Sequence, residues 1–172
     1  MTQAQNDMSR LDEDYTLPTK KAGSYFKPSE TKTKIRIMSK PITGWIERHE
    51  KTPVRTKEKP SKNYDDNKPA KHFWAMVVWN YAREQFEIWE ITQASIREQI
   101  LALKDGDWWN PTGYDLVVRK EGKDLETKYF VATTPSGITP VADEISDKYV
   151  VTDIYLEELY TGWNPFAPEE RF

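Results

Sequence analysis

The chain has 172 residues, the length of one domain with tails, and its 37% hydrophobic content predicts that part of it lies outside a packed core. The absence of cysteine excludes disulfides, thiolate catalysis and cysteine-ligated zinc sites. The net charge of −3 hides an asymmetry, because residues 17–75 hold 15 basic and six acidic residues while residues 139–172 hold two and eight. Residues 1–14 lack the apolar core of a secretory signal, and no stretch approaches the roughly 18 apolar residues of a membrane span, so we expect a cytoplasmic protein.

The first third of the chain predicts a flexible arm, one strand and a long loop. Residues 1–30 are polar and without period, which is typical of disorder. Lys34–Met38 alternates basic and apolar residues and predicts a strand that continues to Ile46, with a bend at Gly44. Residues 48–71 contain three prolines and few apolar residues, and therefore predict a long functional loop. Its basic residues are Arg48, Lys51, Arg55, Lys57, Lys59, Lys62, Lys68 and Lys71.

The middle of the chain predicts a strand pair followed by a helix. His72–Trp79 is β-branched and aromatic without glycine or proline, which predicts a strand that is apolar on both faces. A tight turn near Ala82 and Arg83 leads to a partner strand over Gln85–Ile91. Thr92 is the expected N-cap of a helix that ends before Gly106 and has an apolar face of Ile96, Ile100 and Leu103.

The last third predicts a hairpin and an acidic end. Tyr114–Lys120 and Leu125–Ala132 read as strands, and Glu121–Asp124 reads as the turn between them. Residues 139–172 form an acidic C-terminal extension, in which Asp153–Tyr160 predicts a short helix.

Five strands with one helix between the third and the fourth are the order of an OB-fold, so residues 31–138 predict a mainly β, five-stranded OB-like Greek-key barrel. That fold binds oligonucleotides across the face of its strands 2 and 3, with the loops that join strands 1–2 and 4–5. Here the first of these loops is the basic segment 48–71, the second is the turn at Gly122 and Lys123, and the strand 2–3 face is Phe73–Ile91. The positive charge therefore lies where the fold needs it.

The same region resembles the single-stranded-DNA-binding proteins encoded in phage replication modules. The resemblance covers roughly residues 33–134 and depends on Lys34-Ile35-Arg36-Ile37 with Gly44-Trp45, on Lys71–Tyr81, on Glu90-Ile91-Thr92-Gln93, and on Trp108 with Pro111–Asp115. It implies a protein that coats and protects single strands during phage replication, recombination or repair, in the cytoplasm of a bacterial host. Some phage relatives carry a cysteine–histidine zinc site, and this chain has no cysteine for it.

Proteins that bind single strands without sequence preference pair a cationic groove for phosphates with rings that stack on bases. The predicted phosphate ligands are Lys34, Arg36, Arg55, Lys57, Lys59, Lys62, Lys71, Arg119 and Lys128. The predicted stacking rings are Trp45, Tyr64, Trp74 and Tyr129. Trp74 shares its strand face with His72 and Asn80, and these polar neighbours predict that this face meets solvent.

Other functions remain open at this point. The two histidines have no metalloprotease spacing and the glycines form no phosphate loop, so the sequence predicts no catalytic residue, no metal and no cofactor. Single-stranded RNA would use the same lysines and rings, and a protein-interaction or virion structural module could use the Trp-rich face. The acidic extension could compete with DNA and recruit replication proteins; alternatively, Ile154, Leu156, Leu159 and Tyr160 pack on the barrel.

Overall fold

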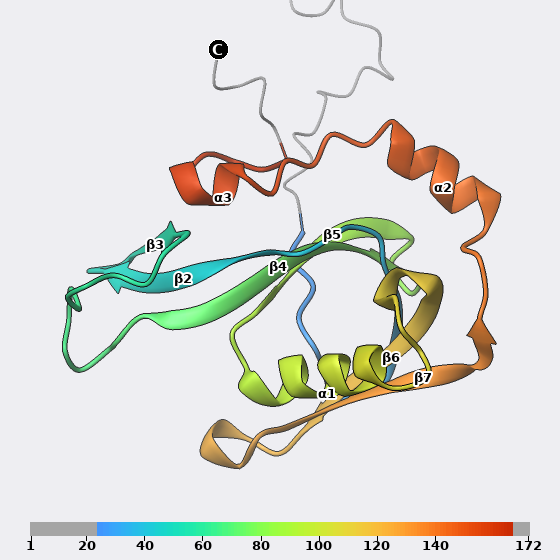
Figure 1. The fold of residues 1–172 in the computed structure, drawn as a ribbon, viewed down its shortest axis with the longest axis horizontal. Helices are drawn as coiled ribbons and strands as arrows, with labels where there is room; N and C mark the ends of the chain where they lie inside the picture. The colour runs from blue at the N-terminus through green and yellow to red at the C-terminus, as the bar shows by residue number, and fades with distance from the viewer. Residues whose placement is uncertain (1–23, 167–172) are drawn as a thin grey trace, which may run out of the picture.

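The structure is a computed structural model that describes residues 24–166 (Figure 1). Expectations for residues 1–23 and 167–172 lie outside the described residues. Within them the chain forms a mainly β fold with an open antiparallel sheet of seven strands and three α-helices. The elements are β1 (Thr33–Ile37), β2 (Ile42–His49), β3 (Thr52–Thr56), β4 (Lys71–Asn80), β5 (Gln85–Ile91), α1 (Ala94–Asp105), β6 (Tyr114–Glu121), β7 (Lys128–Ile138), α2 (Asp143–Val150) and α3 (Glu158–Thr161), with short 3-10 turns η3 (Pro111–Gly113) and η4 (Asp124–Glu126).

The predicted five-stranded closed barrel is wrong in three respects. The strands follow the order β3-β2-β4-β1-β6-β7, and β5 pairs with the other edge of β4, so the sheet stays open between β5 and β7. There are seven strands in the described part, and the long helix lies between the fifth and the sixth. The positions of β4, β5, α1 and β6 along the chain agree with the prediction to within two residues.

The predicted first strand is two strands with a break between them. The break falls at Met38–Pro41 and not at Gly44. Pro41 has no N–H to donate, and the Ser39 hydroxyl accepts a hydrogen bond from the N–H of Val77 on β4 at 2.8 Å, where the ladder is interrupted. Both β1 and β2 pair with β4, on its C-terminal and N-terminal halves respectively.

The predicted loop 48–71 is partly a hairpin. β2 continues to His49, and Glu50 turns the chain in a left-handed conformation (φ 62°) into β3. The remaining loop covers residues 57–70. Gly44 makes this hairpin possible, because a Cβ at that position would stand 2.3 Å from the Thr56 carbonyl oxygen.

Each face of β4 packs against its own apolar cluster, which confirms the prediction of a strand apolar on both faces. On the inner face, Met76 and Val78 join Ile35, Leu116 and Val118 around α1, which contributes Ile96 and Ile100. On the outer face, Phe73, Ala75 and Val77 are covered by the chain from the end of α2 onward, through Tyr149, Ile154, Leu156, Leu159, Tyr160 and Phe166. Figure 1 shows α1 on one side of β4 and β5, with α2 and α3 on the other.

Helix α1 fills the opening between β5 and β7. The Gln99 side chain donates to the Tyr129 carbonyl at 2.8 Å and accepts from the Val131 N–H at 2.9 Å, which satisfies part of the free edge of β7. The predicted N-cap Thr92 is wrong by one residue, since Gln93 holds that position and makes no side-chain cap.

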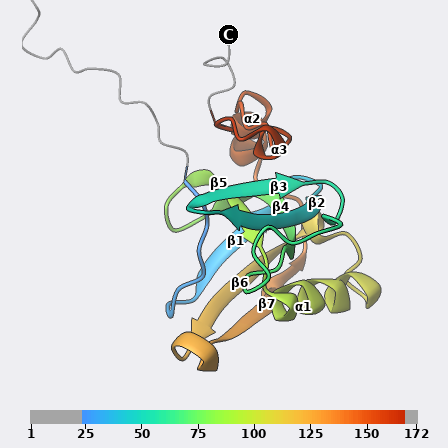
Figure 2. The ribbon, with the colours of Figure 1, turned by 90° about the vertical axis from the view of Figure 1, so that its left-hand side faces the viewer.

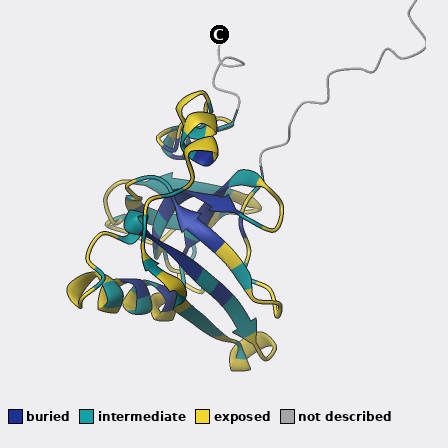
Figure 3. Cartoon of the chain, turned by 90° about the vertical axis from the view of Figure 1, so that its right-hand side faces the viewer, coloured by how far each residue is buried: buried dark blue, intermediate teal, exposed yellow. Residues whose placement is uncertain are grey.

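The two ends of the described chain pack on the sheet. Residues 24–30 belong to the predicted flexible arm, yet Phe26 is buried and its ring meets Trp89 edge-on at 5.3 Å between centroids. The alternative in which Ile154, Leu156, Leu159 and Tyr160 pack on the sheet is confirmed. Figure 3 shows the buried strands at the centre and the exposed outer surfaces of α1 and the C-terminal segment.

Candidate nucleic-acid interface

The most basic part of the described chain projects beyond the core. We call residues 42–72 the basic lobe; they comprise β2, β3, the loop 57–70 and the start of β4, and they lie at the left of Figure 1. The lobe holds eight basic and five acidic residues. Figure 2 shows it in front view, with the β6–β7 hairpin projecting on the same side of the molecule.

Trp45 lies at the centre of the inner face of the basic lobe. It pairs with His72 on β4 and with Thr56 on β3, and its ring centroid lies 5.0 Å from that of His72. The ring is partly exposed, and the Lys59 ammonium stands 5.1 Å from its centroid. An ammonium over an indole face is a cation–π contact, and the same indole face can accept a nucleobase.

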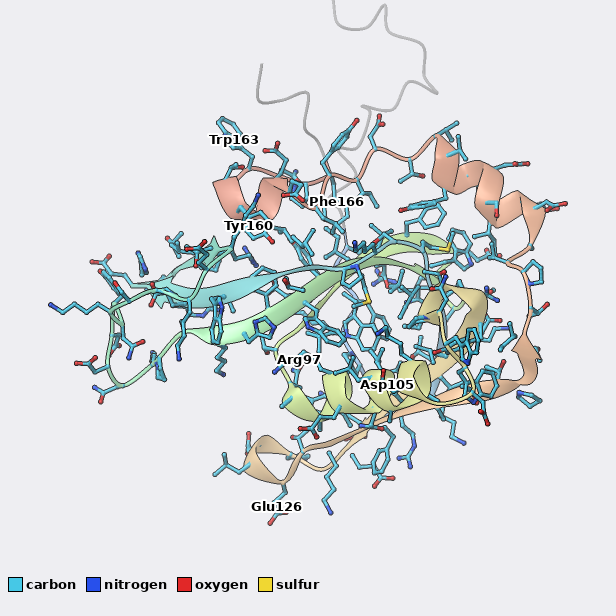
Figure 4. All side chains as sticks on the ribbon, viewed as in Figure 1. Arg97, Asp105, Glu126, Tyr160, Trp163 and Phe166 are labelled. Atoms are coloured by element: carbon cyan, nitrogen blue, oxygen red, sulfur yellow. The ribbon has the colours of Figure 1, made fainter. Side chains whose placement is uncertain are left out.

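The start of β4 is fixed by α1. Arg97 donates from Nη1 to the carbonyl oxygen of His72 at 3.1 Å, and Figure 4 places its side chain beneath the lobe. The ring pair of Trp45 and His72 therefore rests on a strand that is tied to the core.

The loop 57–70 is held to β2 by a second ring pair. The rings of His49 and Tyr64 stack at 4.1 Å between centroids with 14° between their planes. The Glu47 carboxylate binds both partners, at 3.0 Å from His49 Nε2 and 3.2 Å from the Tyr64 N–H. These hydrogen bonds, with His49 the larger contributor, lower the pKa of Glu47 below its ordinary value. The carboxylate thus stays charged and keeps Tyr64 on the same strand face as Trp45.

Seven predicted site residues lie in the basic lobe, and six of them, all but the ion-paired Arg55, are available at its surface. Of these six, all except Trp45, which is partly exposed, are exposed: Lys57, Lys59, Lys62, Tyr64 and Lys71. Lys57 also meets the C-terminal segment, with its Nζ 3.8 Å from Glu157 and 5.2 Å from the Tyr160 ring centroid. Exposed ion pairs of this kind contribute little, so Lys57 stays available.

Three predicted ligands have structural roles instead. Arg36 is 1% exposed, because it is paired with Asp115 at 2.8 Å and donates to the carbonyl oxygens of Thr112 and Thr139. Arg55 makes two hydrogen bonds to the Glu90 carboxylate, the shorter at 2.6 Å. Trp74 packs against the inner core cluster, so the prediction that its face meets solvent is wrong: the polar neighbours His72 and Asn80 lie at the ends of the strand.

The remaining four candidates lie on β1, β6 and β7. Tyr129 packs against the inner core, which leaves its ring partly buried. Lys34, Arg119 and Lys128 point to the other side of the sheet, and the structure does not bring them to the basic lobe.

The strand 2–3 face predicted to bind oligonucleotides is covered. Its Trp74 side packs against the inner core cluster, and on its other side the C-terminal segment buries Phe73, Val77 and Ile88 beneath Leu156 and Leu159. This correction moves the candidate interface to the basic lobe, where Trp45 and Lys59 meet on the inner face and Lys57 and Lys71 lie towards the outer face. Sequence reasoning missed His49, His72 and Arg97, since their roles depend on the pairing of β2 with β4 and on the docking of α1.

Among residues 24–166, no group of His, Asp and Glu side chains is arranged to hold a metal ion. No helix in the same range is long and apolar enough to cross a membrane.

Comparisons with protein-family models, with curated proteins and with solved structures find no match for this chain.

Proposed function

We propose that the basic lobe binds single-stranded DNA without sequence preference, by phosphate contacts and base stacking. The observation that carries the proposal is the partly exposed Trp45 ring with Lys59 over it, at the base of a loop with further exposed lysines. A base that stacks on Trp45 displaces Lys59 from the ring and leaves its ammonium beside the phosphate of the same nucleotide.

The spacing of the rings supports this function. Trp45 and His49 are four residues apart on one face of β2, and a strand rises about 3.4 Å per residue, so their rings are about 14 Å apart. Tyr64 extends this row, because it stacks on His49 and is 53% exposed. Two separated ring positions, Trp45 and the stacked pair of His49 and Tyr64, with lysines around them suit an extended single strand, whereas a duplex keeps its bases stacked on one another.

We further infer that the chain path is that of an OB-like fold whose barrel is left open. In this interpretation β1 and β2 together are its first strand, β4 and β5 its second and third, and β6 and β7 its fourth and fifth. The pairing of β1 with both β4 and β6, and the position of α1 between β5 and β6, support it.

Replacement of Trp45 by alanine tests the stacking directly. Each stacked base contributes about 1–3 kcal/mol, so W45A should weaken binding of oligo-dT by about 5- to 150-fold, measured by fluorescence anisotropy of a labelled strand. Trp109→Ala is the matched control, because Trp109 is 73% exposed and lies after α1, away from the lobe. Equal affinity of the W45A and W109A proteins would exclude Trp45 from the interface.

A further inference from the structure

Three predicted ligands outside the basic lobe, Lys34, Arg119 and Lys128, share one face of the sheet with the rings of Tyr81 and Phe130. In the register of β6 and β7, Val118 pairs with Val131 and both belong to the inner core, so Arg119 and its partner Phe130 point outward. Ile35 on β1 is also in the core, so Lys34 points outward as well. We call the surface formed by Lys34, Tyr81, Arg119, Lys128 and Phe130 the outer cation face.

Both rings of this face carry a cation. The Lys34 Nζ lies 4.2 Å from the centroid of Tyr81, and the Arg119 Cζ lies 4.3 Å from the centroid of Phe130. Arg119 is also ion-paired with Glu121, which helps to fix its guanidinium over the ring. A guanidinium plane held on a ring offers its free side to a base, and it can donate to a phosphate at its edge.

The charge on this face complements a polyanion. Lys34 and Lys128 are exposed and Arg119 is partly exposed. In the outward-facing rows of β6 and β7, the exposed carboxylate beside these cations is that of Glu121. Asp115 lies on this side too, but it is buried and neutralised by Arg36. Because cations cover the rings of this face, an apolar protein surface that bound here would have to desolvate those cations. The face is therefore a poor match for such a partner.

The outer cation face and the Trp45 ring of the basic lobe point to opposite sides of the sheet. Trp45 and His72 lie in the inner rows of β2 and β4, which continue into the inner core through Trp74 and Met76. The β6–β7 hairpin projects on the same side of the molecule as the lobe (Figures 1 and 2), and it carries the exposed Lys123 and Lys128 at its end. A strand that leaves the lobe can pass this hairpin and reach the outer face.

We propose that the outer cation face is a second contact surface for the same single strand, so that a long strand is bound at two places and a short one at the lobe alone. This inference rests on the proposed function of the basic lobe. It predicts that affinity and salt dependence both increase with strand length beyond what the lobe covers.

The test compares two charge-reversal proteins on two lengths of oligo-dT. Lys34→Glu with Lys128→Glu alters the outer face; Lys104→Glu with Lys148→Glu makes the same change of net charge on α1 and α2. An OB-type domain covers about 4–16 nucleotides, so we choose strands of about 8 and about 30 nucleotides. The outer-face variant should lose about tenfold or more in affinity for the long strand. Its affinity for the short strand should equal that of the control.

Each result has a distinct meaning. Equal losses in the two variants on the long strand, or an outer-face variant that weakens both lengths alike, would overturn the second surface. Failure of the unaltered protein to bind the short strand would instead refute the function of the lobe. The melting temperature of each variant is measured to show that it is folded. Arg119→Lys serves as a milder change of the outer cation face, because it retains the charge but not the flat guanidinium.

Discussion

At the residue scale, Lys34 and Arg36 show how one sequence pattern holds two roles. Both are basic residues in Lys34-Ile35-Arg36-Ile37, and alternation places them on the same strand face. Arg36 faces Asp115, 79 residues away in the chain, and is buried with it. Lys34 faces Val117 and remains exposed. The sequence predicts that the two side chains share a face. It does not show that β1 pairs with β6 in the register that places Asp115 opposite Arg36.

Tyr81 completes the Arg36–Asp115 pair and gives it a dependence on pH. Its hydroxyl donates to Asp115 Oδ1 at 2.7 Å. Burial and this hydrogen bond raise the pKa of Tyr81 to about 12. A raised pKa means that the folded state holds the proton more tightly, so this stabilisation is complete below the ordinary pKa of about 10 and is lost as pH rises towards 12.

We therefore expect Tyr81→Phe to lower the free energy of unfolding by about 1.5–3 kcal/mol near neutral pH, the range for a hydrogen bond to a charged group. The difference from the unaltered protein should shrink above about pH 10, because only the unaltered protein loses this stabilisation there. Urea unfolding at about pH 8 and about pH 11 measures both values. A difference that stays constant or grows with pH would contradict this role of the hydroxyl.

At the element scale, strong periodic patterns predicted the elements that the core needs. β4 and β5 combine branched and aromatic residues with a short turn, and α1 has an apolar face that ends before glycine. β3 was missed because Thr52–Thr56 holds Val54 as its one aliphatic residue and also a proline. It is a strand because β2 pairs with it at the edge of the sheet, where proline is tolerated.

Gly44 is the position on which the β2–β3 hairpin depends. Alanine there should destabilise the protein by about 1–3 kcal/mol, the usual cost of overpacking, because its Cβ meets the Thr56 carbonyl. Trypsin should also cut the basic lobe faster. Gly113→Ala is the control, since a Cβ there makes an ordinary contact at 3.9 Å with Ile138. If G44A and G113A unfolded at the same urea concentration, the close approach would not matter.

The C-terminal segment is part of the core, although its acidic composition predicted an extension. Leu159 is 3% exposed against the outer face of β4. Leu159→Ala should therefore cost about 2–5 kcal/mol of unfolding free energy, the usual range for a buried leucine. Val150→Ala should be nearly neutral, because Val150 is 83% exposed. Urea unfolding of the two variants measures both free energies. Equal stability would mean that the C-terminal segment is not tightly packed on β4.

At the scale of the whole molecule, the fold separates a buried apolar centre from its charged projections. The central strands are buried on both faces, while the basic lobe extends beyond them and is fixed at Trp45, His72 and Tyr64. The exposed lysines of the basic lobe could be predicted from the sequence, because a run of cations without apolar residues is expected at the surface whatever the pairing of the strands. The sequence could not show that the predicted strand 2–3 face is covered, since the packing of α1 on one side and of residues 149–166 on the other are long-range contacts.

The salt dependence of single-strand binding tests the central claim most directly. For single strands log K falls by about 0.7 per phosphate contact for each tenfold rise in salt, so contacts from Lys57, Lys59, Lys62 and Lys71 predict a slope near −3 for oligo-dT. Replacement of Lys57, Lys59 and Lys62 by alanine should bring the slope near −1 and leave the melting temperature unchanged, because all three are exposed. A slope near zero in the unaltered protein, an unchanged slope in the triple variant, or equal affinity for duplex DNA would contradict a single-strand interface on the basic lobe.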